Sequence, residues 1–189
     1  MSAAVMMERI GGASPRFKAR IAGILYFFSL VTAASTELFA RGGLNIAGGL
    51  IAVAGMVAMT LLIYDILNPV NKALALLAAS FSLVGLTFEA LRLNPRGVDI
   101  ALVFHGFYCL LIGYLIFRST FMPRILGVLM AIAGLAWLTF LSSPLADHLS
   151  PYNTASGIIG DGLVCLWLIV MGVNAQRWKE QAGAAGGVL

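Results

Sequence analysis

The chain alternates between long apolar runs and short polar connections. Six runs have roughly the 17 to 25 mainly apolar residues that a helix needs to cross a bilayer: residues 19–39, 43–67, 73–93, 100–117, 125–141 and 152–173. The runs are apolar on all sides, unlike the one-sided helices of a soluble core, and they lack the strict alternation of β-barrel strands. The pattern therefore predicts an all-α polytopic membrane protein with six transmembrane helices in one bundle.

Composition supports an integral membrane protein. Hydrophobic residues make up 60% of the chain and charged residues 11%, with a mean hydropathy of +0.95, whereas soluble domains carry about a quarter charged residues. We expect a cytoplasmic basic N-terminal segment over residues 1–18, a six-helix transmembrane domain over 19–178, and a disordered Gly/Ala-rich tail over 179–189.

The distribution of basic residues predicts the orientation. When the chain is threaded through the membrane six times, nine of the twelve Lys and Arg residues fall on one side: Arg9, Arg16, Lys18, Arg20, Lys72, Arg118, Arg124, Arg177 and Lys179. Because cytoplasmic loops carry an excess of basic residues, both termini are expected in the cytoplasm and the protein in the inner (plasma) membrane. The net charge of +4 then reflects topology, and no nucleic-acid partner is expected. The lipid bilayer is the expected partner, and a homo-oligomer or a partner in a membrane complex stays open.

Glu37, Glu89, His105 and Asp161 are ionisable residues that lie inside the apolar runs and toward their outer side. A charge at the centre of a membrane helix costs about 2.5 to 3.5 kcal/mol on insertion scales, so such residues usually face a bundle interior or a cavity. Asp161 is the principal candidate, because no basic residue stands within a turn on its own helix. Its neighbours Gly160 and Gly162 predict a weak helix that opens to expose backbone carbonyls, as in transporter ion sites. The alternative is a protonated Asp161 bonded to a neighbouring helix.

His105 has Tyr108 three residues later, on the same helical face. A satisfied polar core residue is the favoured interpretation of His105. A catalytic zinc site needs three protein ligands, so His105 would have to combine with Asp161, Glu89 or Glu37. Cys109 and Cys165 lack CxxC spacing and are expected to be space-filling buried thiols. No haem or nucleotide motif appears, and no cofactor is predicted.

Several shorter patterns predict local structure. Glu37 with Arg41, and Glu89 with Arg92, have the spacing of ion pairs on one helical face. Asp99 has the position of a helix N-cap. The connections around Pro69 and Pro123 predict that runs two and three, and runs four and five, are antiparallel neighbours. Glycines seven residues apart predict close packing between helices of one chain, favoured over a dimer seam. The loop over residues 142–152 is the candidate for an external cap over the outer side.

The stretch DIALVFHGFYCLLIGYLIFRSTFMPRILGVLMAIAGLAWL, with RIAGILYF and NPVNKALALLA earlier in the chain, resembles the DUF4386 family of bacterial multi-pass membrane proteins of unknown function. The resemblance runs from Arg20 to about Trp178. It implies a helical membrane bundle and brings no settled activity. The chain departs from the family pattern at two positions: the usual His of the fourth span would fall at Tyr108, and an Arg of the third span at Ser82.

Three functions are consistent with these features. The leading hypothesis is a polar cavity in the outer half of the bundle that binds or moves a small solute, cation or proton. Asp161 would be its principal ligand, with Glu89, His105, Tyr108 and Glu37 in the wall. The alternatives are an intramembrane metal-dependent enzyme acting on lipid, and a structural or accessory subunit of a membrane complex. Binding is favoured over catalysis.

Overall fold

The computed structural model describes residues 14–39, 43–93 and 98–186, apart from the side chains of residues 36–38. Within these ranges the chain is helical and has no strand. The elements are α2 (Pro15–Phe39), α3 (Gly43–Leu67), α4 (Lys72–Ala90), α5 (Ile100–Arg118), α6 (Arg124–Leu138), the short 3₁₀ turn η2 (Thr139–Leu141), α7 (Ser143–Leu149), α8 (Tyr152–Val170) and α9 (Ala175–Gly186). Six segments are long and apolar enough to cross a membrane. The predicted all-α fold with six such helices in one bundle is confirmed.

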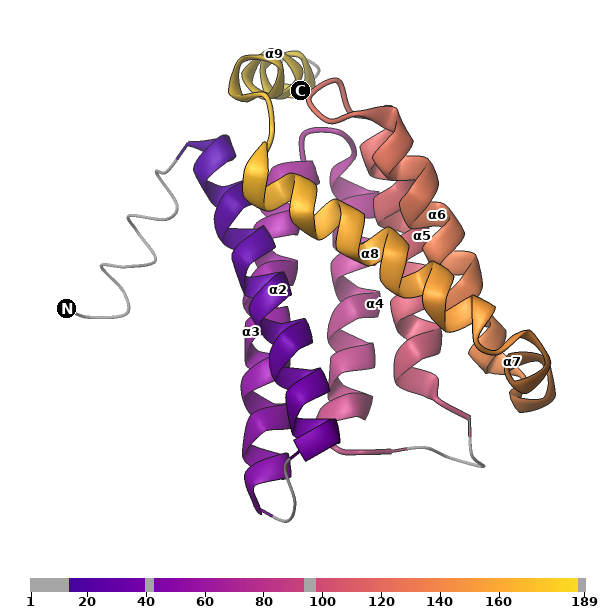
Figure 1. Cartoon of the computed structure of the whole chain (residues 1–189). Helices are drawn as coiled ribbons and strands as arrows, with labels where there is room; N and C mark the ends of the chain where they lie inside the picture. Colours follow the sequence, from indigo (N-terminus) through magenta and orange to yellow (C-terminus); the bar gives the residue numbers. More distant parts are fainter. Residues whose placement is uncertain (1–13, 40–42, 94–97, 187–189) are drawn as a thin grey trace.

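The six long helices form a closed ring. Neighbours in the ring are α2 and α3, α3 and α4, α4 and α5, α5 and α6, and α6 and α8, while α8 crosses obliquely back to α2 (Figure 1). The two predicted antiparallel pairs, α3 with α4 and α5 with α6, are thus confirmed as neighbours. The start of α2 meets the end of α8, where Arg16 Nε donates to the Met171 carbonyl and Arg20 Nη2 to the Val170 carbonyl. The side of the membrane that this end faces stays a prediction.

The outer surface of the ring is apolar. Ile24 and Phe28 of α2, Leu135 of α6 and Val170 of α8 are each more than half exposed. Soluble monomers rarely expose contiguous apolar surface of this kind. Lipid tails accommodate these side chains at no cost, which explains why the helices are apolar on both their inner and outer sides.

Glycines bring α5 and α6 into close contact. A Cβ added at Gly113 would lie 2.7 Å from the Gly127 carbonyl oxygen, and one added at Gly134 would lie 2.8 Å from the Gly106 carbonyl oxygen. Only glycine permits so close an approach of two backbones. The seven-residue glycine spacing therefore serves packing within the chain, as predicted. It also sets the separation of the helices that carry His105 and Trp137.

Helix ends follow the expected capping chemistry. The Asp99 side chain accepts a hydrogen bond from Leu102 N at 3.2 Å, so the predicted N-cap of α5 is confirmed. Helix α4 ends at Ala90, three residues before the predicted end of its span. Arg92 there adopts the left-handed conformation (φ 51°), and the amides of Arg92 and Leu93 bond back to Glu89 and Phe88. This Schellman motif ends the helix. The Arg92 guanidinium is then directed to Asn45 of α3, to which it donates.

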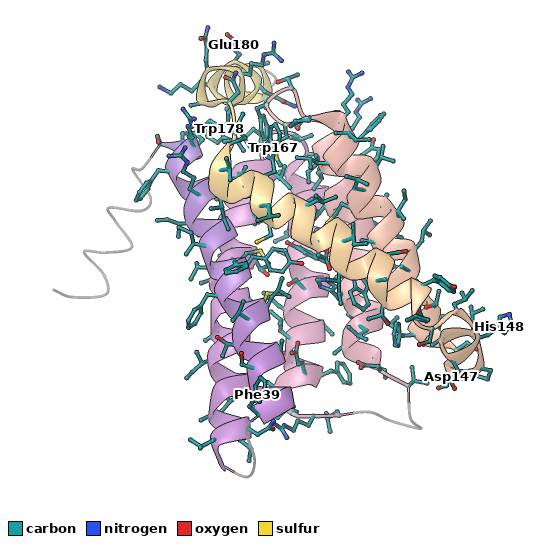
Figure 2. All side chains as sticks on the ribbon, in the orientation of Figure 1. Phe39, Asp147, His148, Trp167, Trp178 and Glu180 are labelled. Atoms are coloured by element: carbon teal, nitrogen blue, oxygen red, sulfur yellow. The ribbon has the colours of Figure 1, made fainter. Side chains whose placement is uncertain are left out.

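The tail predicted to be disordered from residue 179 is helical as far as Gly186 in α9, so that prediction is wrong for residues 179–186. Two physical reasons explain the helix. Alanine-rich sequence has high helix propensity, and Trp178 anchors the start of α9 by donating from Nε1 to the Ile66 carbonyl at 2.8 Å. Trp178 and Trp167 lie at the same end of the bundle (Figure 2), and such tryptophans are typical of a membrane–water interface.

The candidate cap over residues 142–152 contains the short helix α7. Asp147 and His148 are exposed and lie at the far tip of the bundle (Figure 2). Helix α7 packs on η2 and α8. No residue of α7 lines the cavity described below, so this loop does not cover it.

Candidate functional site

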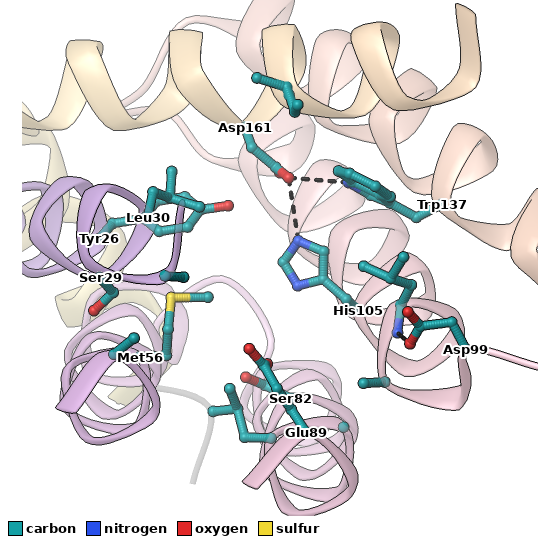
Figure 3. A pocket seen from close by; sticks show the side chains of 17 residues that line it. Tyr26, Ser29, Leu30, Met56, Ser82, Glu89, Asp99, His105, Trp137 and Asp161 are labelled. Carbon is teal, nitrogen blue, oxygen red and sulfur yellow. Dashed lines mark hydrogen bonds and ion pairs between the residues drawn. The ribbon is translucent and has the colours of Figure 1, made fainter. Parts of the chain in front are cut away.

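A central cavity of about 290 Å³ lies inside the helical ring. All six long helices contribute to its lining, which includes Tyr26 and Ser29 of α2, Glu89 of α4, His105 of α5 and Asp161 of α8 (Figure 3). It occupies the half of the bundle where α4 ends and α5 begins, away from the start of α2. The sequence predicts that this half faces the outside of the cell.

Asp161 lies at the floor of the cavity and is only 3% exposed. Trp137 Nε1 donates a hydrogen bond to its Oδ2 at 3.0 Å, and His105 Nε2 lies 3.1 Å from the same oxygen. Cys109 Sγ donates to the other carboxylate oxygen, Oδ1, at 3.6 Å. Three side chains from α5 and α6 therefore hold Asp161, which agrees with the alternative interpretation that it bonds to neighbouring helices.

Helix α8 stays intact around Asp161, contrary to the predicted opening at its glycines. The glycines serve packing instead. A Cβ at Gly157 would overlap the indole of Trp137, and one at Gly160 would lie 2.7 Å from Ala133 Cβ. Because these glycines have no side chain, α8 packs closely against α6, and Trp137 Nε1 lies beside Asp161.

His105 and Cys109 stand one turn apart on α5 and therefore share a face. The His105 side chain is 18% exposed and reaches the cavity, whereas Cys109 is fully buried beneath it. The sequence analysis predicted Cys109 to be a space-filling buried thiol and did not assign it to the site. The i, i+4 spacing of His105 and Cys109 was the signal available in the sequence for adding Cys109 to His105 and Asp161.

One ligand atom from each of His105, Cys109 and Asp161 can be chosen so that all three lie within 4.8 Å of one another. Imidazole, thiolate and carboxylate are the donors that zinc binds in proteins. Of the residues predicted to complete a metal site with His105 whose side chains the structure describes, Asp161 belongs to this group. Glu89 lies elsewhere on the cavity wall.

Tyr26 and Ser29 of α2 line the cavity, and the sequence did not single them out. Tyr26 is 2% exposed and Ser29 is 1% exposed, and both hydroxyl oxygens are buried with no hydrogen-bond partner among the described residues. They stand three residues apart and thus on one helical face. Figure 3 shows the Tyr26 hydroxyl directed into the space that separates α2 from His105 and Asp161.

The other predicted wall residues have separate positions. Glu89 is exposed and lines the cavity near the end of α4. The ring of Tyr108 lies beside His105 in a tilted arrangement, with ring centroids 5.8 Å apart, but its hydroxyl donates to Met59 Sδ at 3.7 Å in the apolar core. The side chain of Glu37 lies outside the described residues, as does its predicted partner Arg41.

Apolar side chains close the bundle below the cavity. The next void toward the start of α2 is only about 20 Å³ and is lined by residues such as Met59, Ile63, Ile112 and Leu168. That volume is about the space of one water molecule. Among the residues that the structure describes, the cavity therefore forms a chamber in one half of the bundle and does not continue to the end where α2 begins.

Comparison with known proteins supports the family resemblance. Residues 86–172 match the family model of DUF4386, a domain of unknown function. An uncharacterized protein of the archaeon Archaeoglobus fulgidus is 26% identical over 139 residues, which cover 68% of this chain and 83% of that protein. No solved structure matches the chain. The resemblance to DUF4386 predicted from the sequence is therefore confirmed, over the segment that carries Glu89, His105, Cys109, Trp137 and Asp161.

Proposed function

We propose that this integral membrane protein binds a small polar solute, a cation or a proton in its central cavity, with Asp161 as the principal ligand. The observation that carries the proposal is the floor of the cavity. There a buried carboxylate with His105 beside it faces the hydroxyl group of Tyr26, which has no hydrogen-bond partner among the described residues.

Burial makes these groups informative. Placing a hydroxyl in an apolar environment without a hydrogen bond costs about 1 to 3 kcal/mol on mutational evidence, so two such hydroxyls on one wall indicate that something bonds to them. A guest between α2 and α8 would accept from or donate to the Tyr26 hydroxyl on one side and contact Asp161 and His105 on the other.

The size and lining of the cavity select a small guest. Ligand pockets usually measure about 300 to 1,000 Å³, and this cavity, at about 290 Å³, lies at the lower limit. Its upper walls are apolar, with Leu30, Leu86 and Ile158 among the lining residues. Apolar walls around a few convergent polar groups are typical of binding sites, and they strengthen electrostatic attraction to Asp161 by excluding water.

The proposal is tested with Asp161→Asn and a matched control, Asp147→Asn, which removes an exposed carboxylate outside the cavity. Native mass spectrometry in mild detergent measures any bound guest. Thermal unfolding is measured in Na⁺, K⁺ and Zn²⁺ salts and over a range of pH. A ligand present at 100 times its dissociation constant stabilises the folded state by about 2.7 kcal/mol.

We expect wild type and Asp147→Asn to show the same bound mass or the same ion- and pH-dependent stabilisation, and Asp161→Asn to lose it. Circular dichroism establishes that the variant is folded. The proposal is wrong if folded Asp161→Asn keeps the bound mass and the ion and pH dependence of the wild-type protein.

A further inference from the structure

We infer that His105, Cys109 and Asp161 form a binding site for one divalent metal ion of the zinc type, reached from the cavity. This inference rests on the proposed function, because it names the class of cation that Asp161 would hold. It adds Cys109 as a ligand.

The distances in the trio suit a tetrahedral ion. Zinc lies about 2.0 to 2.3 Å from nitrogen, oxygen and sulfur ligands, so two ligands of one tetrahedral ion are about 3.3 to 3.7 Å apart. Cys109 Sγ lies 3.6 Å from Asp161 Oδ1, and His105 Nε2 lies 3.1 Å from the second oxygen of the same carboxylate, Oδ2. With one carboxylate oxygen as the ligand, the three ligand atoms all lie within 4.8 Å of one another. Side-chain adjustments of about 1 Å would bring all three atoms onto one ion.

The donor set selects the kind of ion. Magnesium and calcium prefer all-oxygen coordination, and one thiolate with one imidazole is a poor match for them. Zinc and its close analogue cobalt accept sulfur, nitrogen and oxygen together. A site with three protein ligands leaves a fourth position, and the cavity lies above His105 and Asp161, where water or a solute would occupy that position.

Charge balance also favours a divalent ion. The Cys109 thiolate and the Asp161 carboxylate together carry two negative charges, which one divalent cation neutralises. The bound site would then carry no net charge in the membrane interior, where an uncompensated charge is costly. A monovalent ion would leave a net negative charge at the same depth.

Trp137 supplies the outer-shell contact that metal sites commonly show. Its Nε1–H donates to Asp161 Oδ2 at 3.0 Å, which orients the carboxylate and leaves Oδ1, on the side of Cys109, available for the ion. Loss of such an outer-shell hydrogen bond typically weakens metal affinity about 10- to 100-fold.

The test uses the full chain in mild detergent after removal of metal with a chelator. Zinc is titrated and counted by elemental analysis after dialysis, and Co²⁺ is added as a spectroscopic probe, because cobalt–thiolate bonding gives a charge-transfer absorption. The chain has two cysteines, so Cys165→Ser leaves Cys109 as the only thiol. Cys165 donates to the Gly23 carbonyl and lies outside the trio.

We expect one zinc ion per chain in wild type and in Cys165→Ser, with the cobalt–thiolate absorption retained in both. Trp137→Phe should weaken zinc binding about 10- to 100-fold, and Cys109→Ser should weaken it further and abolish the absorption. Since the Cys165→Ser spectrum alone assigns the thiolate, the test does not depend on the folding of Cys109→Ser.

Absence of zinc binding, or a cobalt spectrum without thiolate absorption in Cys165→Ser, would overturn the inference. Suppose that zinc binding fails but Asp161→Asn abolishes a bound mass or a response of stability to pH, Na⁺ or K⁺. The proposed function then stands, and only the metal site is wrong. If Asp161→Asn also changes none of these properties, both are wrong.

Discussion

At the residue scale, the proposed function depends on how a buried carboxylate is held inside the bundle. Asp161 is held by Trp137, His105 and Cys109, so the bundle satisfies the acid from two other helices. Tyr26 and Ser29 on the opposite wall have no such contacts among the described residues. The side chains bonded to Asp161 therefore hold the site together, whereas the Tyr26 hydroxyl is available to a guest.

Tyr26→Phe tests this distinction. Because the Tyr26 hydroxyl bonds to nothing in the described residues, its removal should leave the free energy of unfolding of the ligand-free protein unchanged or raise it by about 1 kcal/mol. Stabilisation by the ions that respond to Asp161 should decrease. Thermal unfolding with and without Na⁺, K⁺ or Zn²⁺ measures both quantities.

Tyr108→Phe is the matched control, because its hydroxyl donates to Met59 Sδ in the apolar core. It should leave the ion response intact. Destabilisation of the ligand-free protein by Tyr26→Phe, with the ion response unchanged, would contradict the assignment of this hydroxyl to the guest.

At the element scale, close contacts between backbones place the site. The glycines of α5 and α6 set the position of His105 relative to Trp137, and Gly157 and Gly160 bring α8 onto α6. In lipid the hydrophobic effect does not drive helices together, so association depends on van der Waals packing and hydrogen bonds. Small residues that permit close approach are then the main source of specificity.

Gly127→Ala should disturb this arrangement. A Cβ there would lie 2.5 Å from the Gly113 carbonyl oxygen and 2.7 Å from Phe117 N, and backbone atoms can yield only if α5 and α6 separate. We expect a loss of about 1 to 3 kcal/mol in the free energy of unfolding, measured by titration with SDS in mixed micelles.

Gly162→Ala is the control, because an added Cβ meets nothing within 4 Å. Alanine is a better helix former than glycine by about 1 kcal/mol, so this variant should be as stable as wild type or more stable. Equal stability of the two variants would show that the α5–α6 contact does not limit the fold.

At the scale of the whole molecule, the ring of six helices encloses a chamber that is polar at its floor and closed toward the end where α2 begins. The even number of spans places the start of α2 and the end of α8 at the same end of the bundle. Access to the chamber is thus expected from the side opposite to both termini.

Cysteine accessibility in intact cells tests this one-sided access. The native thiols are buried and should not react. Ala101→Cys, on the cavity wall, should react with a membrane-impermeant thiol reagent added outside, whereas Ile63→Cys, in the closed half, should not. A fluorescent-protein fusion at the C-terminus should be active in the cytoplasm.

Reaction of Ile63→Cys at the rate of Ala101→Cys would indicate a continuous pore. A C-terminal reporter that is active only outside the cytoplasm would reverse the predicted orientation and place the cavity on the inner side.

The sequence by itself determined the six membrane-length helices, the two antiparallel pairs and the N-cap at Asp99. It also indicated that Glu89, His105 and Asp161 lie in one half of the bundle, where the structure places them. These features depend on span length, loop length and local spacing, which can be read along the chain because every span meets the same bilayer thickness.

Only the tertiary structure decided which side chains meet. The bonds of Trp137 and Cys109 to Asp161, the unsatisfied hydroxyls of Tyr26 and Ser29, and the anchoring of α9 by Trp178 all join segments far apart in sequence. A helix that is apolar on all sides carries no periodic signal of which face turns inward, because lipid and protein interior are equally apolar. Contacts between the packed helices decide that face, and with it the composition of the site.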